Sequence, residues 1–96
     1  MQIQMTGHGL DISTALRELA EKKLNRLHPC FDEITNIHIT FRVDKIRQIA
    51  DANLQLPGSR INAQAESEDM YQTIDLLIQK LQTQLTKYKS KKDDHR

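Results

Sequence analysis

Three consecutive segments in the middle of the chain alternate between apolar and polar residues, and this alternation constrains the fold more than any other feature. Residues 36–44, 50–56 and 60–66 all follow it. In the first segment the apolar set is Ile37, Ile39, Phe41 and Val43. A period of two is typical of strands that bury one face. Because the turn Pro57-Gly58-Ser59 separates the last two segments, we predict an antiparallel meander with one apolar face.

A helix is predicted between a short N-terminal strand and the meander. Residues 2–6 alternate as the strand, and the glycines within residues 7–9 indicate a turn after it. The apolar residues that follow recur at helical spacing and form one stripe: Ile12, Leu16, Leu19, Ala20, Leu24 and Leu27. Asp11 or Ser13 can cap this helix, and Pro29 ends it.

The last third of the chain predicts a second amphipathic helix, opened by Ser67 or Asp69. Its apolar stripe consists of Met70, Ile74, Leu77, Ile78, Leu81, Leu85 and Tyr88. At about 100° per residue, Lys80, Lys87 and Lys91 lie within roughly 40° of one another, beside the stripe. We call these three residues the lysine row. Such a row presents cations along a rigid helix.

The predicted order is β-α-β-β-β-α. Two helices with one apolar stripe each can cover the apolar face of the sheet, which gives an α+β fold. We therefore expect a two-layer sandwich with a four-stranded sheet and both helices on one face. Residues 1–90 are expected to form a single domain, and residues 91–96 a frayed basic tail.

Charge is distributed unevenly along the chain, although the formal net charge is only +1. Residues 31–78 contain four basic and eight acidic side chains, whereas residues 79–96 contain six basic and two acidic ones. The first thirty residues contain four basic and three acidic side chains. A separation of this kind orients a protein toward a polyanion even when the total charge is near zero.

Basic residues also lie on the first predicted helix. Lys22 and Arg26 are spaced i, i+4, and Lys23 falls inside the apolar stripe. Lysines near a helix end often only complement the helix dipole or solvate a face. Lys80 lies well before the last turn, however, which favours a binding role. Since both helices pack on one sheet face, we expect their basic edges to line one groove that binds RNA or DNA by backbone charge.

Other kinds of site have little support. Base stacking is not expected to dominate, because the aromatic residues are only Phe31, Phe41, Tyr71 and Tyr88. His28, Cys30 and Asp32 alternate through a turn, but no second cluster accompanies them, so a loop cysteine is a better interpretation than a metal site. No nucleophile–base pair or glycine-rich phosphate loop occurs. We therefore expect neither enzyme activity nor a cofactor.

The sequence favours a cytoplasmic location. No apolar run approaches the roughly 20 residues that a membrane helix needs, so no membrane association is expected. The N-terminus lacks the basic and apolar regions of a signal peptide. Cys30 is the only cysteine, so an intrachain disulfide cannot form.

Residues throughout the chain resemble a known family. The second helix contains Asp69-Met70-Tyr71, Ile74-Asp75, Lys80-Leu81 and Gln84-Leu85-Thr86-Lys87. The first contains Ile12-Ser13-x-Ala15-Leu16-Arg17 and Lys23-x-x-Arg26-Leu27, followed by Phe31. The middle strands contain Ala50-Asp51-Ala52 and Ala63-x-Ala65-Glu66. Together these motifs resemble the ribosome hibernation factors, the family of hibernation-promoting factor and ribosome-associated inhibitor, also called the sigma-54 modulation or ribosomal S30EA family.

The resemblance implies a fold similar to double-stranded-RNA-binding domains. It also implies binding to the bacterial 30S subunit in the channel for mRNA and tRNA, at the A and P sites, with inhibition of translation in stationary phase or stress. The short chain resembles the branch that promotes inactive 100S ribosome dimers together with a separate ribosome modulation factor, and we expect a monomer when free. The implied rRNA-binding residues are Lys22, Lys23, Arg26, Lys80, Lys87, Lys89 and Lys91, with Arg17, Tyr71 and Lys92 as weaker candidates.

The chain departs from this pattern at three positions. Close relatives often have arginine at the position of Thr83, and a small and an acidic residue at the positions of Leu76 and Gln79. Thr83 therefore removes one implied rRNA contact. Two rival functions stay open: a general double-stranded-RNA-binding module, and a small adaptor whose polar sheet face binds a protein.

Overall fold

The computed structural model describes the backbone of residues 1–93 and the side chains of residues 1–91. The strands are β1 (Gln2–His8), β2 (Asn36–Asp44), β3 (Arg47–Leu56) and β4 (Ser59–Ser67). The helices are α1 (Thr14–Leu24), the short 3-10 helix η1 (Phe31–Glu33) and α2 (Met70–Asp93). This order confirms the predicted one and adds η1. Residues 91–93 of the expected tail continue α2, and residues 94–96 lie outside the described part.

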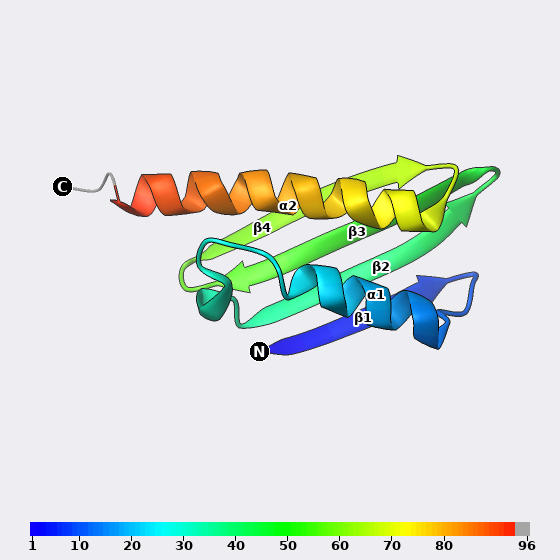
Figure 1. The fold of residues 1–96 in the computed structure, drawn as a ribbon, viewed down its shortest axis with the longest axis horizontal. Coiled ribbons are helices and arrows are strands. Elements are labelled where there is room, and N and C mark those ends of the chain that lie inside the picture. The colour runs from blue at the N-terminus through cyan, green and yellow to red at the C-terminus, as the bar shows by residue number, and fades with distance from the viewer. Residues whose placement is uncertain (94–96) are drawn as a thin grey trace.

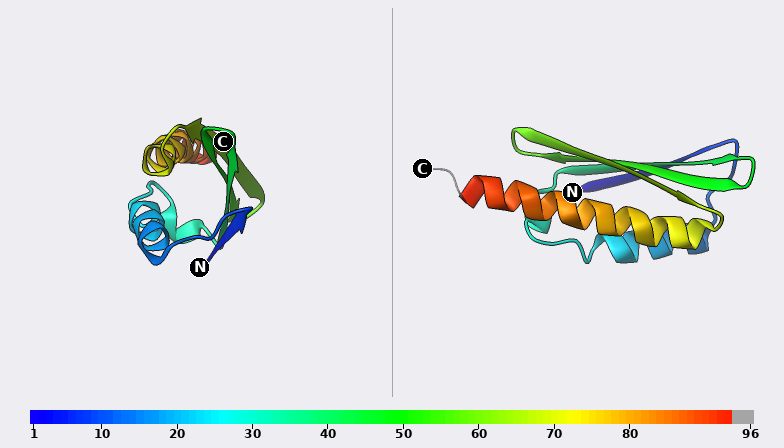
Figure 2. Two further views of the ribbon diagram at one scale, coloured as in Figure 1. Left: turned by 90° about the vertical axis from the view of Figure 1, so that its right-hand side faces the viewer. Right: turned by 90° about the horizontal axis from the view of Figure 1, so that it is seen from above.

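The four strands form one sheet in the order β1-β2-β3-β4. β1 runs parallel to β2, and the pairs β2–β3 and β3–β4 are antiparallel, which confirms the meander. Both helices cover the same face of the sheet, α2 over β3 and β4 and α1 toward β1 and β2 (Figures 1 and 2). The predicted α+β sandwich is therefore confirmed.

Four alanines of β3 and β4 form the part of the sheet surface on which α2 packs, and we call them the alanine floor. Ala50 pairs with Ala65 and Ala52 with Ala63 across β3 and β4, and all four side chains are buried. Three fully buried leucines of α2 complete this part of the core: Leu77, Leu81 and Leu85. Because alanine side chains are short, the helix axis can approach the strands closely, and larger residues on the strands would crowd the leucines.

The first helix begins as predicted but ends early. Of the two candidate caps, Ser13 is used: its Oγ accepts a hydrogen bond from the backbone N–H of Leu16 at 3.1 Å. The helix ends at Leu24 rather than near Pro29. Asn25 Nδ2 donates to the carbonyl of Glu21 at 2.9 Å, a local bond of the kind that competes with helix continuation.

The predicted turn after the first strand is also displaced. β1 continues through Gly7 to His8 instead of stopping at Thr6. A Cβ atom at Gly7 would lie 2.3 Å from the carbonyl oxygen of Leu10, a distance that no side chain tolerates. Gly7 is therefore required for the close approach of the following loop, and not for a turn.

The far end of the β2–β3 hairpin departs from simple alternation. Val43, expected to face inward, is 44% exposed, while Ile49 on the opposite sheet face is only 4% exposed. The hairpin extends beyond the ends of both helices (Figure 1), so no helix covers its tip. On the face away from the helices, the neighbours of Ile49 across the ladders are Arg42 and Glu66.

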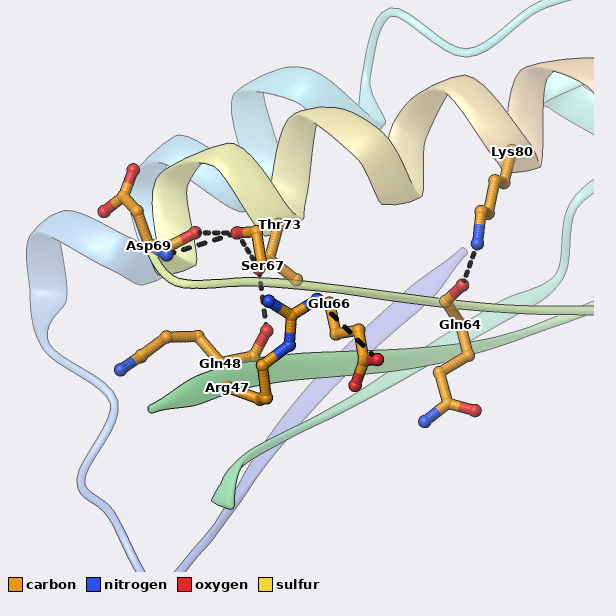
Figure 3. Close-up of polar contacts among 8 residues, drawn as sticks. All are labelled: Arg47, Gln48, Gln64, Glu66, Ser67, Asp69, Thr73 and Lys80. Atoms are coloured by element: carbon orange, nitrogen blue, oxygen red, sulfur yellow. Dashed lines mark hydrogen bonds and ion pairs between the residues drawn. The ribbon is translucent and has the colours of Figure 1, made fainter. Parts of the chain in front are cut away.

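A buried polar cluster fixes the start of α2 on the sheet (Figure 3). Asp69 is the N-cap: its Oδ2 accepts from the N–H of Gln72 at 3.1 Å. Ser67 supports it, with its Oγ 2.7 Å from the Oγ1 of Thr73. Thr73, which is fully buried, donates to the carbonyl of Gln48 on β3 at 2.8 Å. The predicted opening near Ser67 or Asp69 is confirmed, since both residues take part.

Replacing Thr73 with valine should destabilise the fold, because a methyl group would leave the Gln48 carbonyl and the Ser67 hydroxyl without this partner. We expect the free energy of unfolding to fall by about 1–3 kcal/mol in urea titrations. The control Thr83→Val makes the same chemical change at an exposed position of α2 and should cost only about 0.5 kcal/mol. Equal losses in the two variants would contradict this role of Thr73.

Candidate nucleic-acid interface

The lysine row runs along the side of α2 that faces the edge strand β4. Lys80 Nζ donates to the carbonyl oxygen of Gln64 on β4 at 2.6 Å (Figure 3). Lys80 and Lys87 line a shallow hollow together with Gln64 and Thr83. Since β4 has a strand partner on one side only, its outward carbonyls need other donors, and Lys80 supplies one. The row is therefore held against the sheet edge at one end.

Lys23 makes a different contact. Its Nζ lies 2.6 Å from Oδ1 of Asp75, so an ion pair joins α1 to α2. The Lys23 side chain is 26% exposed and that of Asp75 53% exposed. Lys23 thus lies between the helices, as its position within the apolar stripe predicts, and its charge is already paired in the free protein.

The expectation that the basic edges of both helices line one groove is wrong for the lysine row. Two residues show which side of α2 faces α1. Asp75 pairs with Lys23 of α1, and the side chain of Gln82 forms hydrogen bonds with the backbone N–H and carbonyl of His28, just after α1. Lys80 follows Asp75 by five residues, which is about 140° around the helix. The row therefore borders β4, and the space between the helices is bordered by a mixed, partly neutralised set of charges.

The other predicted contacts distribute over several faces. Lys22 is exposed on α1 and Arg26 just after its end, whereas Arg17 lies on α1 about 140° around the helix from Lys22. On α2, Tyr71 is 48% exposed, and helical spacing places Tyr71 and Lys89 within about 40° of Asp75, on the side toward α1. The side chain of Lys92 lies outside the described residues. The lysine row thus borders β4, whereas Lys22, Lys23 and Arg26 belong to α1 and the residues just after it.

No metal site or membrane-spanning element was found in the described residues. No group of three or more His, Cys, Asp or Glu side chains there is arranged to hold a metal ion. Cys30, from the weak candidate motif, is half-buried at a positive φ of 65° before η1. Within that same part of the chain, no helix is both long enough and apolar enough to cross a membrane.

Sequence reasoning did not identify Arg60 as a neighbour of the lysine row. Arg60 is exposed at the start of β4, and it lines a groove with Lys87 and Lys91. The turn at residues 57–59 is the signal that could have identified Arg60. It leads into the edge strand β4, and α2 covers that edge, so residues at this turn lie beside α2. Spacing along the sequence alone does not show which helix covers that edge.

Comparison with known proteins defines the family. Residues 3–93 match the family of the sigma 54 modulation protein and S30EA ribosomal protein. The chain belongs to this family. Relatives in it include the ribosome hibernation promoting factors of Klebsiella oxytoca, 46% identical, and of Escherichia coli K12, 42% identical. Each of these two alignments covers 99% of this chain and 100% of the relative.

Solved structures agree with this family assignment. A ribosomal subunit interface protein from Coxiella burnetii is 68% identical, with a TM-score of 0.93 over 94% of this chain and 99% of that one. The N-terminal domain of Thermus thermophilus Protein Y is 26% identical, with a TM-score of 0.79 over 92% of this chain and 99% of that one. The fold, including both helices, is therefore shared within the family.

The Lys23–Asp75 pair should contribute little to stability, because both groups are partly exposed. A double-mutant cycle with Lys23→Met and Asp75→Asn, measured by urea unfolding, should give a coupling energy of about 0.2–1 kcal/mol. The coupling should shrink at 1 M salt, where charges are screened beyond about 3 Å. A coupling of several kcal/mol that is insensitive to salt would contradict the view of Lys23 as a weakly held, accessible cation.

Proposed function

We propose that this protein is a non-enzymatic ribosome hibernation factor of the bacterial cytoplasm. It binds the small ribosomal subunit in the channel that otherwise holds mRNA and the anticodon ends of tRNA, at the A and P sites. Occupying this channel inhibits translation in stationary phase or under stress. Acting with a separate ribosome modulation factor, it promotes inactive 100S dimers.

The family supports the ribosome as the target. Relatives that align with this chain over their entire length are hibernation promoting factors, and a solved relative is a ribosomal subunit interface protein. Neither family membership nor fold identifies the channel or the rRNA contacts. For these the proposal depends on the surface of this chain.

The observation that carries the proposal is the lysine row. Lys80, Lys87 and Lys91 are exposed on one side of a single straight helix, and none of them is in an ion pair of the described part. Ion pairs in that part include those of Lys23 with Asp75 and of Arg47 with Glu66. Cations aligned on one side of a helix, without an ion-pair partner among the described residues, favour a phosphate backbone, which they bind by charge and shape without reading bases.

Reversing two charges of the row should abolish binding to small subunits. Lys80→Glu combined with Lys87→Glu removes two phosphate contacts and adds repulsion, while both sites lie outside the core, so stability should change by about 0.5 kcal/mol each. The measurement is co-sedimentation with purified subunits. Lys45→Glu with Arg47→Glu, on the β2–β3 hairpin, makes the same change in net charge and should leave binding intact. Unchanged co-sedimentation of the Lys80/Lys87 variant would refute the proposed contact.

Salt should weaken the complex steeply if phosphates are the partner. The logarithm of the association constant should fall by about 0.7–0.9 per phosphate neutralised for each unit of log salt concentration. Replacing Lys80 and Lys87 with methionine should reduce this slope by about two. A shallow slope for the wild type would favour a protein-binding adaptor, and equal affinity for ribosomes and arbitrary RNA duplexes would favour a general duplex binder.

A further inference from the structure

A groove lies where α2 passes the β3–β4 hairpin. The last turns of the helix extend beyond the end of the sheet at this hairpin (Figures 1 and 2). The space between them has a volume of about 810 Å³, within the range of small-ligand sites. Residues 57–61 line one side, and Gln84, Lys87, Tyr88 and Lys91 line the other.

The lining combines cations with apolar surface. Arg60 on the hairpin and Lys87 and Lys91 on the helix are exposed, and among the side chains that the structure describes no acidic one lines the groove. The apolar surface comes from Pro57, the buried Ile61 and the half-buried Tyr88.

The tyrosine ring is held from both ends. Its ring packs against the core, and its hydroxyl donates to Oε1 of Glu33 on η1 at 3.2 Å. An aromatic side chain fixed in this way supplies contact area without a large loss of side-chain entropy on binding. Tyr88 is thus a rigid part of the groove wall rather than a mobile surface residue.

We propose that this groove takes an unpaired nucleotide of an RNA strand. Its phosphates contact Arg60, Lys87 and Lys91, and its base lies against Tyr88 and the neighbouring apolar surface. The inference rests on the proposed function and adds a distinct subsite to it. A guanidinium opposite two ammonium groups suits phosphate, to which arginine donates two parallel hydrogen bonds.

The apolar wall favours an unpaired nucleotide over a duplex. In a duplex the base faces are stacked on one another, so they cannot reach Tyr88, whereas an unstacked base can lie on an aromatic side chain. A single tyrosine can stack on one base only. This agrees with the expectation that base stacking is not the main contribution to RNA binding by this protein. The groove shares Lys87 and Lys91 with the lysine row, so a strand that follows the row reaches the groove.

The first test is NMR titration of the full-length protein with a short single-stranded RNA. We expect shifts of the amides of residues 58–61 and of the Tyr88 ring, and smaller shifts with an RNA duplex of equal charge. Arg60→Ala should weaken binding of the single strand about tenfold. The control Arg42→Ala removes an exposed arginine from β2, on the sheet face away from the helices, and should have no effect.

The aromatic contact can be tested separately from the fold. Tyr88→Phe keeps the ring and should retain binding, whereas Tyr88→Leu should lose about fivefold or more. Thermal melts show whether both variants fold. If Tyr88→Phe and Tyr88→Leu are folded and bind equally, the base does not lie on this ring and the proposal is overturned.

Cross-linking identifies the occupant on the ribosome. A photoreactive amino acid in place of Ser59, which lines the groove, should cross-link to rRNA in complexes with small subunits. A cross-link to a ribosomal protein alone would assign the groove to an acidic peptide and overturn the proposal. If the protein co-sediments with subunits but RNA causes no NMR shifts in residues 58–61 or the Tyr88 ring, the groove proposal is overturned and the proposed function stands. Failure to co-sediment at all would overturn the proposed function itself.

Discussion

The packing of α2 on the alanine floor of β3 and β4 determines the position of the lysine row. Leu77, Leu81 and Leu85 are fully buried against the floor, so α2 cannot rotate about its axis without exposing them. Burying a leucine side chain contributes about 1.5–3 kcal/mol, far more than an exposed ion pair. Rotation is therefore fixed by the apolar residues, and the lysine row lies at the β4 edge as a consequence.

This packing also explains why the basic residues form two surfaces instead of one groove. Lys23 reaches Asp75 from α1, and Gln82 contacts the segment after α1, so polar contacts occupy the space between the helices. The lysine row is on the other side of α2. A polyanion that contacts Lys22 and Arg26 as well as Lys80 and Lys87 must cross over α2, which a bulky, folded RNA can do more readily than a single extended strand.

The sequence predicts the elements well because each has one apolar face with a clear period. The strands of the meander and the starts of both helices follow from local chemistry, whereas the choice of Ser13 over Asp11 and the bond from Thr73 to Gln48 do not. The exposure of Val43 could not be predicted, because alternation does not show where the covering helices end. Helical spacing likewise places Lys80 relative to Leu81, but not relative to β4. The groove at Arg60 depends on such a contact between distant segments, as does the Lys23–Asp75 pair.

Under the proposed function, Thr83 leaves the lysine row with one charge fewer than the resemblance implies. Its hydroxyl donates to the carbonyl of Gln79 at 3.1 Å, so it is used within the helix. Lys80 and Lys87 line the same hollow on either side of it. An ammonium group has three donors, and Gln64 takes one from Lys80, which leaves two for a phosphate. Because this bond already orders the Lys80 side chain, less entropy is lost on binding, and that saving partly offsets the missing arginine.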